Sequence, residues 1–260
     1  MSHYGPKPWL QRHWDARAAA NFMLGGTGAG LLVAAALTGP SRALLLLGLG
    51  LIAAGLAAVW LEIGRKLRAA HVFLNPHTSW MTRESLAAVI LFALGFSYFA
   101  WNESWMQYAT ALAAIVFVAC QAQILRASKG IPAWRAPEVV PLVLTTALAE
   151  GAGLCALFSL HYSVAGLLAL AVLTRSLAWS RYRAALRQPD SRAALEAAGK
   201  ALLQLGTVAP LALLLAGAIV PEAVPLAGLA ALLTGWRFKF VLVARAAFNQ
   251  GFSLQHLPIR

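Results

Sequence analysis

Acidic residues, cysteines and histidines are all scarce in this chain. Nine Asp and Glu residues face 21 Lys and Arg residues, which gives a formal net charge of +12. The two cysteines, Cys120 and Cys155, fall inside apolar runs, so neither a disulfide framework nor a CxxC metal site is expected and both are assigned to packing. None of the six histidines lies in the middle of an apolar run, which argues against paired axial haem ligands and leaves no expected metal.

Long apolar runs dominate what is present. Hydrophobic residues make up 60% of the 260 residues and charged residues only 12%. A helix needs roughly 20 apolar residues to cross a bilayer. We therefore expect an all-α integral membrane protein with eight transmembrane helices, at about residues 21–38, 43–63, 84–101, 105–125, 139–160, 162–180, 198–219 and 223–244.

The positive charges follow this arrangement of spans. With eight spans, nearly all loop Lys and Arg residues fall on one face, and only Arg42 falls on the other. By the positive-inside rule, both termini are expected to be cytoplasmic, and the basic charge reports orientation rather than binding to nucleic acid. The residues on the basic face are Lys7, Arg12, Arg17, Arg65, Lys66, Arg68, Arg83, Arg126, Lys129, Arg135, Arg181, Arg183, Arg187, Arg192, Arg245 and Arg260.

A faint internal repeat divides the chain. Residues 28–31 and 151–154 both read Gly-Ala-Gly-Leu, which either reflects two related four-helix bundles or arises by chance in a chain rich in alanine and glycine. The glycine-rich residues 25–30 follow no strand and lack the Gly-Lys-Ser/Thr ending of a phosphate loop, so they predict close helix packing. The expected organisation is an N-terminal segment 1–20, a first bundle 21–125, a linker 126–138, a second bundle 139–245 and a tail 246–260.

Two carboxylates are expected inside the membrane, Glu62 at the end of the second span and Glu150 in the fifth. An embedded carboxylate is costly unless it is paired, so both are candidates for function or for a structural ion pair. Possible partners of Glu150 are Arg175, Arg237 and Lys239. The remaining acids are placed in loops or at span ends: Asp15, Glu84, Glu103, Glu138, Asp190, Glu196 and Glu222.

Polar residues cluster around the basic face near Glu62. A quinone would need hydrogen-bond donors for its carbonyls, a proton acceptor or donor, and an apolar cleft for its tail, and this set could supply them. Interfacial Arg and His residues also serve as simple anchors, so that interpretation stays open for each. The set comprises Arg17, Asn21, Glu62, Arg65, Arg68, His71, Asn75, His77, Ser79, Trp80, Arg83, Trp236, Arg237, Lys239, Asn249, Gln250 and His256.

Several short motifs give the chain a family resemblance. They are residues 14–22 (WDARAAANF), 64–69 (GRKLRA), 79–84 (SWMTRE), 124–127 (ILRA) with 130–134 (GIPAW), and 248–252 (FNQGF) before 256–258 (HLP). With these motifs the chain resembles membrane-anchor subunits of the DMSO-reductase type, within the wider NrfD-like family. The likeness is nearest to the anchor of phenylacetyl-CoA:acceptor oxidoreductase complexes.

The resemblance implies an anchor in the bacterial inner membrane that exchanges electrons with menaquinone or ubiquinone and holds no haem. Its implied partners are a four-cluster iron–sulfur subunit and a molybdenum or tungsten bis-pyranopterin catalytic subunit, which carry the metals. In relatives an acid or histidine ends the second span at the quinone site, and Glu62 matches it, although the DMSO-reductase anchors tend to have histidine there. Asn21 matches an asparagine in the first span that is a quinone contact in relatives.

The resulting hypothesis assigns three groups of residues. Glu62 is the catalytic proton partner, and Glu62 with Glu150 are the candidates for a proton path. The quinone-binding set is Asn21, Arg17, Glu62, Arg65, Arg68, His71 and Trp80. The partner-docking set is Arg83, Arg126, Lys129, Asn249 and His256.

Two other classes of function remain open. A small secondary transporter would suit the repeat, and broken helices beside Glu150 would favour it, but the polar residues gather at one face rather than at the midplane. An embedded transferase would need a His or Cys nucleophile within a span.

Overall fold

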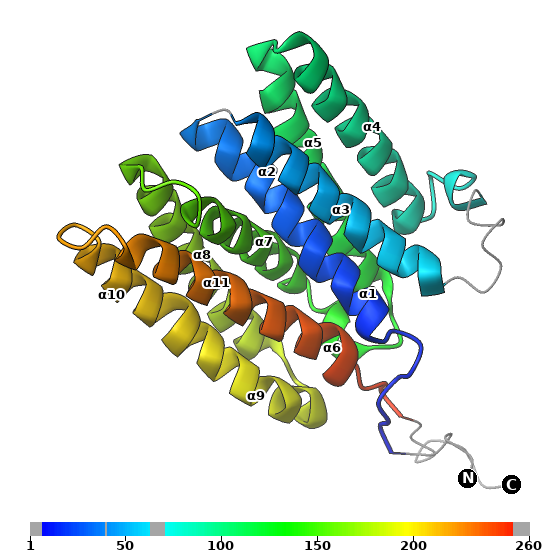
Figure 1. The fold of residues 1–260 in the computed structure, drawn as a ribbon. Helices are drawn as coiled ribbons and strands as arrows, with labels where there is room; N and C mark the ends of the chain where they lie inside the picture. Colours follow the sequence, from blue (N-terminus) through cyan, green and yellow to red (C-terminus); the bar gives the residue numbers. More distant parts are fainter. Residues whose placement is uncertain (1–6, 40, 63–70, 252–260) are drawn as a thin grey trace, which may run out of the picture.

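The structure, a computed structural model, describes residues 7–39, 41–62 and 71–251, with Glu62 described by its backbone alone. Helices form almost all of this part of the chain (Figure 1). In chain order they are α1 (Ala16–Ala20), η1 (Asn21–Gly25), α2 (Gly26–Thr38), α3 (Arg42–Glu62), α4 (Trp80–Trp101), α5 (Ser104–Ala127), α6 (Pro132–Arg135), α7 (Val139–Ala156), α8 (Tyr162–Ala185), α9 (Pro189–Leu203), η3 (Gln204–Val208), α10 (Ala209–Ala216), α11 (Ala223–Phe240) and η4 (Val241–Arg245). The η elements are single π-helical turns that continue the helices beside them.

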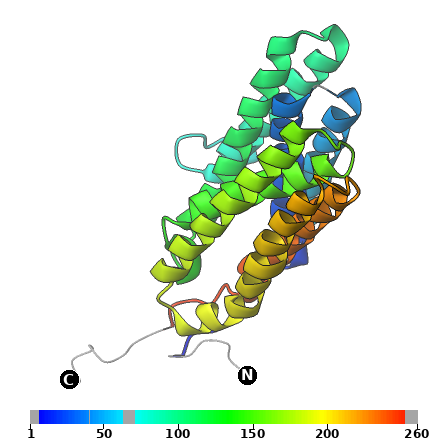
Figure 2. The same ribbon diagram turned by 90° about the vertical axis from the view of Figure 1, so that its left-hand side faces the viewer.

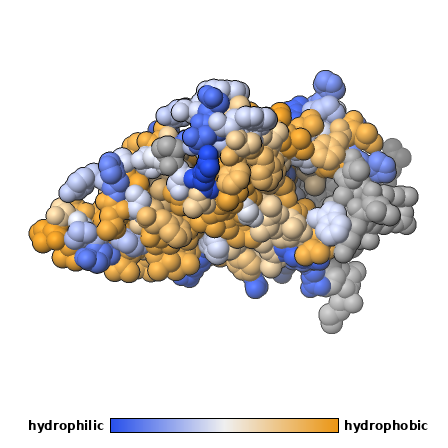
Figure 3. Space-filling model, turned by 45° about the horizontal axis from the view of Figure 1, so that its top comes forward, coloured by the Kyte–Doolittle hydropathy of each residue, from blue (hydrophilic) through white to orange (hydrophobic). Residues whose placement is uncertain are grey.

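Eight of the resulting helical segments are long and apolar enough to cross a membrane, as the sequence predicted. They lie alongside one another over most of the length of the molecule (Figure 2). Large apolar side chains such as Leu112 and Leu170 point outward, at 63% and 60% exposure. The face in Figure 3 is correspondingly dominated by apolar residues, as expected for a surface in contact with lipid. The chain is therefore a multi-pass membrane protein.

Three spans start clearly earlier than predicted: the seventh begins at Pro189 rather than residue 198, and polar side chains cap the first and third. The first span begins at Ala16 rather than residue 21, since the Asp15 side chain accepts a hydrogen bond from the Arg17 backbone N–H. The third begins at Trp80 rather than residue 84, since Ser79 Oγ accepts from the Thr82 N–H. A hydropathy profile does not reveal these capping residues, because they lie outside the apolar runs.

Glycine brings α2 and α7 into direct backbone contact. A Cβ on Gly30 would lie 2.0 Å from the Ala147 carbonyl oxygen, and a Cβ on Gly151 would lie 1.9 Å from the Gly30 carbonyl carbon. The two Gly-Ala-Gly-Leu segments thus pack against each other, and the expected role of the glycine-rich run in close packing is confirmed. This contact joins the first four spans to the last four. The predicted domain boundaries themselves stay a prediction.

The two ends of the described chain lie together. Leu10 and Phe248 form an antiparallel β-bridge, and the Trp9 N–H donates to Asn249 Oδ1 at 2.9 Å. The loop before α9 joins them, since Gln188 Nε2 donates to the Asn249 carbonyl at 2.9 Å. The two ends of the described residues therefore lie at the same end of the helices.

Candidate functional site

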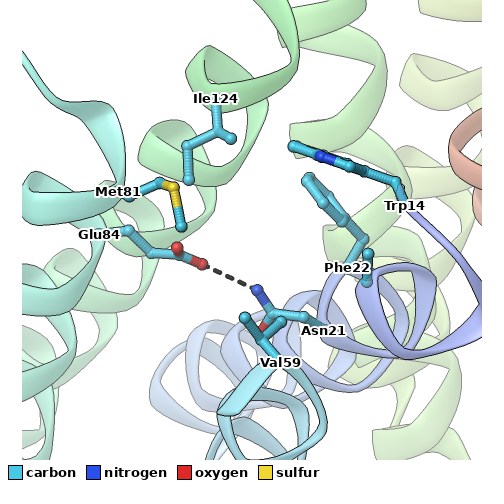
Figure 4. Close-up of a pocket in the computed structure, with 8 residues that line it drawn as sticks. Trp14, Asn21, Phe22, Val59, Met81, Glu84 and Ile124 are labelled. Carbon is cyan, nitrogen blue, oxygen red and sulfur yellow. Dashed lines mark hydrogen bonds between the residues drawn. The ribbon is translucent and has the colours of Figure 1, made fainter. Parts of the chain in front are cut away.

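A cavity of about 210 Å³ lies at the end of the molecule where α1 begins, α3 ends and α4 begins (Figure 4). Its wall is apolar apart from one carboxyl and one amide group. Met81, at 47% exposure, reaches the surface beside it. The lining residues are Trp14, Ala18, Asn21, Phe22, Val59, Met81, Glu84 and Ile124.

Glu84 supplies the carboxyl group, which corrects its predicted position. The sequence placed Glu84 at the edge of a span and left Glu62 and Glu150 as the embedded acids. Because α4 begins at Trp80, Glu84 lies in the second turn and is only 6% exposed. Asn21 Nδ2 donates a hydrogen bond to Glu84 Oε1 at 3.1 Å, and none of the ion pairs between described residues includes Glu84.

Asn21 supplies the amide group and opens the π-helical turn η1. Gln121 Nε2 of α5 donates to the Asn21 backbone carbonyl at 3.2 Å, which fixes this turn against α5. Asn21 Oδ1 and Gln121 Oε1 are buried and accept no hydrogen bond from any residue that the structure describes.

Helix α3 packs closely against the π-helical turn that carries Asn21. A Cβ on Gly55 would lie 3.0 Å from the Gly25 nitrogen and 3.2 Å from Asn21 Oδ1. A larger residue at position 55 would require α3 or the Asn21 segment to shift by a few tenths of an ångström.

The other residues of the predicted quinone set that the structure describes, Arg17, His71 and Trp80, do not line the cavity. Arg17 forms an ion pair with Asp15 at 2.8 Å and donates to the Leu61 carbonyl, which ties α1 to the end of α3. The hydrogen bonds that Arg17 donates to Asp15 lower the pKa of the Asp15 carboxyl. Trp80 opens α4 with the Arg83 guanidinium 4.2 Å from its ring centroid, and His71 is exposed.

Three residues of the predicted quinone-binding set lie wholly or partly outside the described part of the structure. Glu62 is the last residue of α3, as the predicted span implied, but its side chain lies outside the described part of the structure, as do Arg65 and Arg68 in full. Their assigned roles stay predictions.

The predicted docking residues divide into exposed and structural ones. Arg126, in the last turn of α5, and Lys129, in the loop that follows, are exposed. Arg83 instead donates to the Pro76 and His77 carbonyls, both at 2.8 Å, and holds the loop before α4. Asn249 is half-buried in the contact with Trp9 described above, and His256 lies outside the described residues.

A second buried polar cluster lies between α2, α7 and α11. Glu150 forms an ion pair with Lys239 at 2.6 Å, and the Lys239 and Glu150 side chains are 2% and 0% exposed. Thr27 Oγ1 also donates to Glu150 Oε2 at 2.9 Å, and Trp236 Nε1 donates to Thr27 Oγ1 at 2.8 Å. Of the three partners considered for Glu150, the structural ion pair with Lys239 is the one that forms.

The other two cations behave differently. Arg175 is fully buried, but its guanidinium donates to the Ala231 and Gly206 carbonyls, while Arg237 is exposed. Helix α7 is continuous through Glu150, so the break that would favour a transporter does not occur in this helix.

The π-helical turn links the two clusters. Lys239 Nζ donates to the Phe22 carbonyl at 2.9 Å, and Phe22 lines the Glu84 cavity next to Asn21. Gly26 allows this approach, because a Cβ there would lie 2.3 Å from Lys239 Nζ. Lys239 therefore holds the backbone of the segment that presents Asn21 to Glu84.

Comparison with known proteins gives one relative to report. The chain is 30% identical over 135 residues to a protein from Allochromatium vinosum that is named as a subunit of sulfite dehydrogenase. The match covers 45% of this chain and 42% of that protein, so it spans less than half of the relative's length. No family model matches the chain.

Proposed function

We propose that this chain is a membrane-anchor subunit of a multi-subunit oxidoreductase and exchanges electrons between a membrane quinone and a partner subunit. The partial likeness to a sulfite dehydrogenase subunit supports a place in an oxidoreductase complex. The observation that carries quinone reactivity is the cavity in which Glu84 and Asn21 meet. The proposed arrangement is two four-helix bundles in a bacterial inner membrane, with both termini cytoplasmic.

The cavity suits a single neutral ring. At about 210 Å³ it is smaller than the roughly 300–1,000 Å³ of most small-molecule pockets. Its apolar wall would cover the faces of a ring, while the Glu84 carboxyl, held by Asn21, would form a hydrogen bond with an oxygen of the ring. In the cavity Glu84 can accept the proton of a quinol hydroxyl, and Asn21 Nδ2 holds the carboxyl in place through its 3.1 Å hydrogen bond to Oε1.

The proposed reaction is a two-electron, two-proton exchange. When a quinol is oxidised, two electrons pass to the partner subunit. The proton of one hydroxyl group passes to the Glu84 carboxylate, and the proton of the other passes to water. Reduction of a quinone reverses each step. The proposed electron partner is an iron–sulfur subunit, itself joined to a molybdenum or tungsten pterin subunit, because this chain offers no expected metal ligands of its own.

Binding of ring analogues tests the proposal directly. We expect tail-less naphthoquinone or benzoquinone to bind the purified protein in nanodiscs saturably, measured by calorimetry. In Glu84→Leu the dissociation constant should rise at least about tenfold, because a hydrogen bond to a charged group contributes about 1.5–3 kcal/mol. Glu103→Leu changes an exposed carboxyl at the start of α5 and should leave the dissociation constant unchanged. Absence of saturable binding by the unaltered protein would refute the proposal.

A further inference from the structure

A second cavity lies between α3 and α4 and has an apolar wall. Its volume is about 450 Å³. The hydroxyl in its wall, Ser85 Oγ, already donates to the Met81 carbonyl at 3.0 Å, so no polar group there needs a partner. Leu56, Ala57, Trp60, Ala88, Val89 and Phe92 form most of the wall, which is called the α3–α4 groove below.

The residues that line the α3–α4 groove neighbour those of the Glu84 cavity on the same two helices, although the two spaces share no lining residue. On α4, Glu84 and Ala88 are four residues apart and so share one face of the helix. On α3, Val59 of the cavity stands one turn from Leu56 of the groove. From Glu84 to Phe92 the helix rises about 12 Å, so the groove extends further along α4 into the span than the cavity does.

The chemistry of the cavity restricts what can occupy both spaces at once. A phospholipid headgroup is anionic and is bound by Lys and Arg side chains. None of the residues that line the Glu84 cavity is basic, and its one ionisable side chain is a carboxyl, which would repel a phosphate. An occupant with a neutral polar ring and an apolar chain satisfies both the cavity and the groove.

We infer that the α3–α4 groove is the binding site for the isoprenoid tail of the quinone whose ring enters the Glu84 cavity, an inference that rests on the proposed function. The cavity then selects the ring and the groove selects the tail. Affinity should increase with tail length until the groove is filled, because each isoprene unit that enters the groove adds van der Waals contacts with its wall.

Filling the groove separates the tail from the ring. Ala57 is exposed in the groove wall, so Ala57→Trp can fill the groove without disturbing the core. We expect this variant to raise the dissociation constant of an isoprenoid quinone at least about tenfold and to leave that of the tail-less ring unchanged. Ala212→Trp, at an exposed position on α10 away from both cavities, should change neither constant.

The outcomes distinguish the inference from the function it rests on. Failure of the tail-less ring to bind the unaltered protein overturns the proposed function. Ring binding that depends on Glu84, together with equal tail affinity in Ala57→Trp and the unaltered protein, overturns the groove alone. A quinone with a photoreactive tail should crosslink to peptides of α3 and α4, whereas crosslinks confined to α8 and α10 would overturn it. Displacement of the ring by phosphatidylglycerol would also count against the groove.

Discussion

Glu84 is the residue whose chemistry is most open to test. Glu84→Gln keeps hydrogen-bonding capacity but cannot take a proton. In the complex with its partner subunits, we expect this variant to lower quinol-driven electron transfer by about 10²–10⁴, the usual contribution of general acid–base catalysis. Binding of the tail-less ring should change by no more than about threefold, because the amide still reaches a ring oxygen. Steady-state turnover and calorimetry of one preparation check both expectations.

Glu62 is the other candidate for the proton partner of the quinone. The sequence predicts that Glu62→Gln abolishes quinone-coupled turnover while the complex still assembles. A loss of turnover in Glu62→Gln with normal turnover in Glu84→Gln would show that Glu62, and not Glu84, accepts the proton. Glu103→Gln, at an exposed carboxyl, serves as the control for both variants.

The sequence could have indicated Glu84, but by a different signal from the one that revealed Glu62. Glu62 follows an uninterrupted apolar run, so its cost in hydrocarbon is evident from hydropathy. Glu84 follows Arg83, and the polar start of α4 hides it. The signal is Ser79 as a helix cap, which places Glu84 in the second turn, on the face that carries Ala88.

At the scale of elements, the π-helical turn η1 is the feature that relates the two buried clusters. Asn21 at its start contacts Glu84, while the Phe22 carbonyl accepts from Lys239. A π-helical turn frequently marks a functional site, because it shifts the direction of the side chains that follow. The apolar pattern predicted the helix through this region but could not predict the extra residue in the turn, which depends on contacts with α5 and α11.

Paired substitutions can separate the positioning role of Lys239 from its contribution to folding. Lys239→Met alone leaves the Glu150 carboxylate buried and unpaired, and should destabilise the protein by about 3–5 kcal/mol. Lys239→Met combined with Glu150→Leu removes both charges and should restore thermal stability. The double variant should still bind the tail-less ring about three- to tenfold more weakly, since the hydrogen bond that holds the Phe22 carbonyl, worth about 0.5–1.5 kcal/mol, is gone.

Thermal unfolding and ring binding, measured on the same samples, check this expectation. If the double variant regains stability and binds the ring as tightly as the unaltered protein, Lys239 supports only the fold. Weaker binding in a fully stable double variant assigns Lys239 to positioning of the Asn21 segment.

At the scale of the whole molecule, basic side chains gather at one end of the helices. Arg126 lies at the end of α5, Arg183 at the end of α8 and Arg245 at the end of η4, while Arg42 begins α3 at the opposite end, beside Phe99. The sequence predicted this segregation correctly, because it requires only the number of spans and the places of the loops. The Glu84 cavity lies at the same basic end, beside the start of α4.

A basic end beside the cavity predicts where the electron-accepting partner docks. We expect the tagged chain, purified from native membranes, to retain a partner that contains iron and molybdenum or tungsten, measured by elemental analysis. Arg126→Glu combined with Lys129→Glu should lower the retained iron severalfold, and high salt should have a similar effect, because exposed charges steer and orient association but are screened. Arg42→Glu reverses charge at the opposite end and should retain the metals in full. Recovery of the chain without metals under gentle extraction would contradict the proposed partners, and loss of metals in Arg42→Glu alone would move the docking surface to the other side of the membrane.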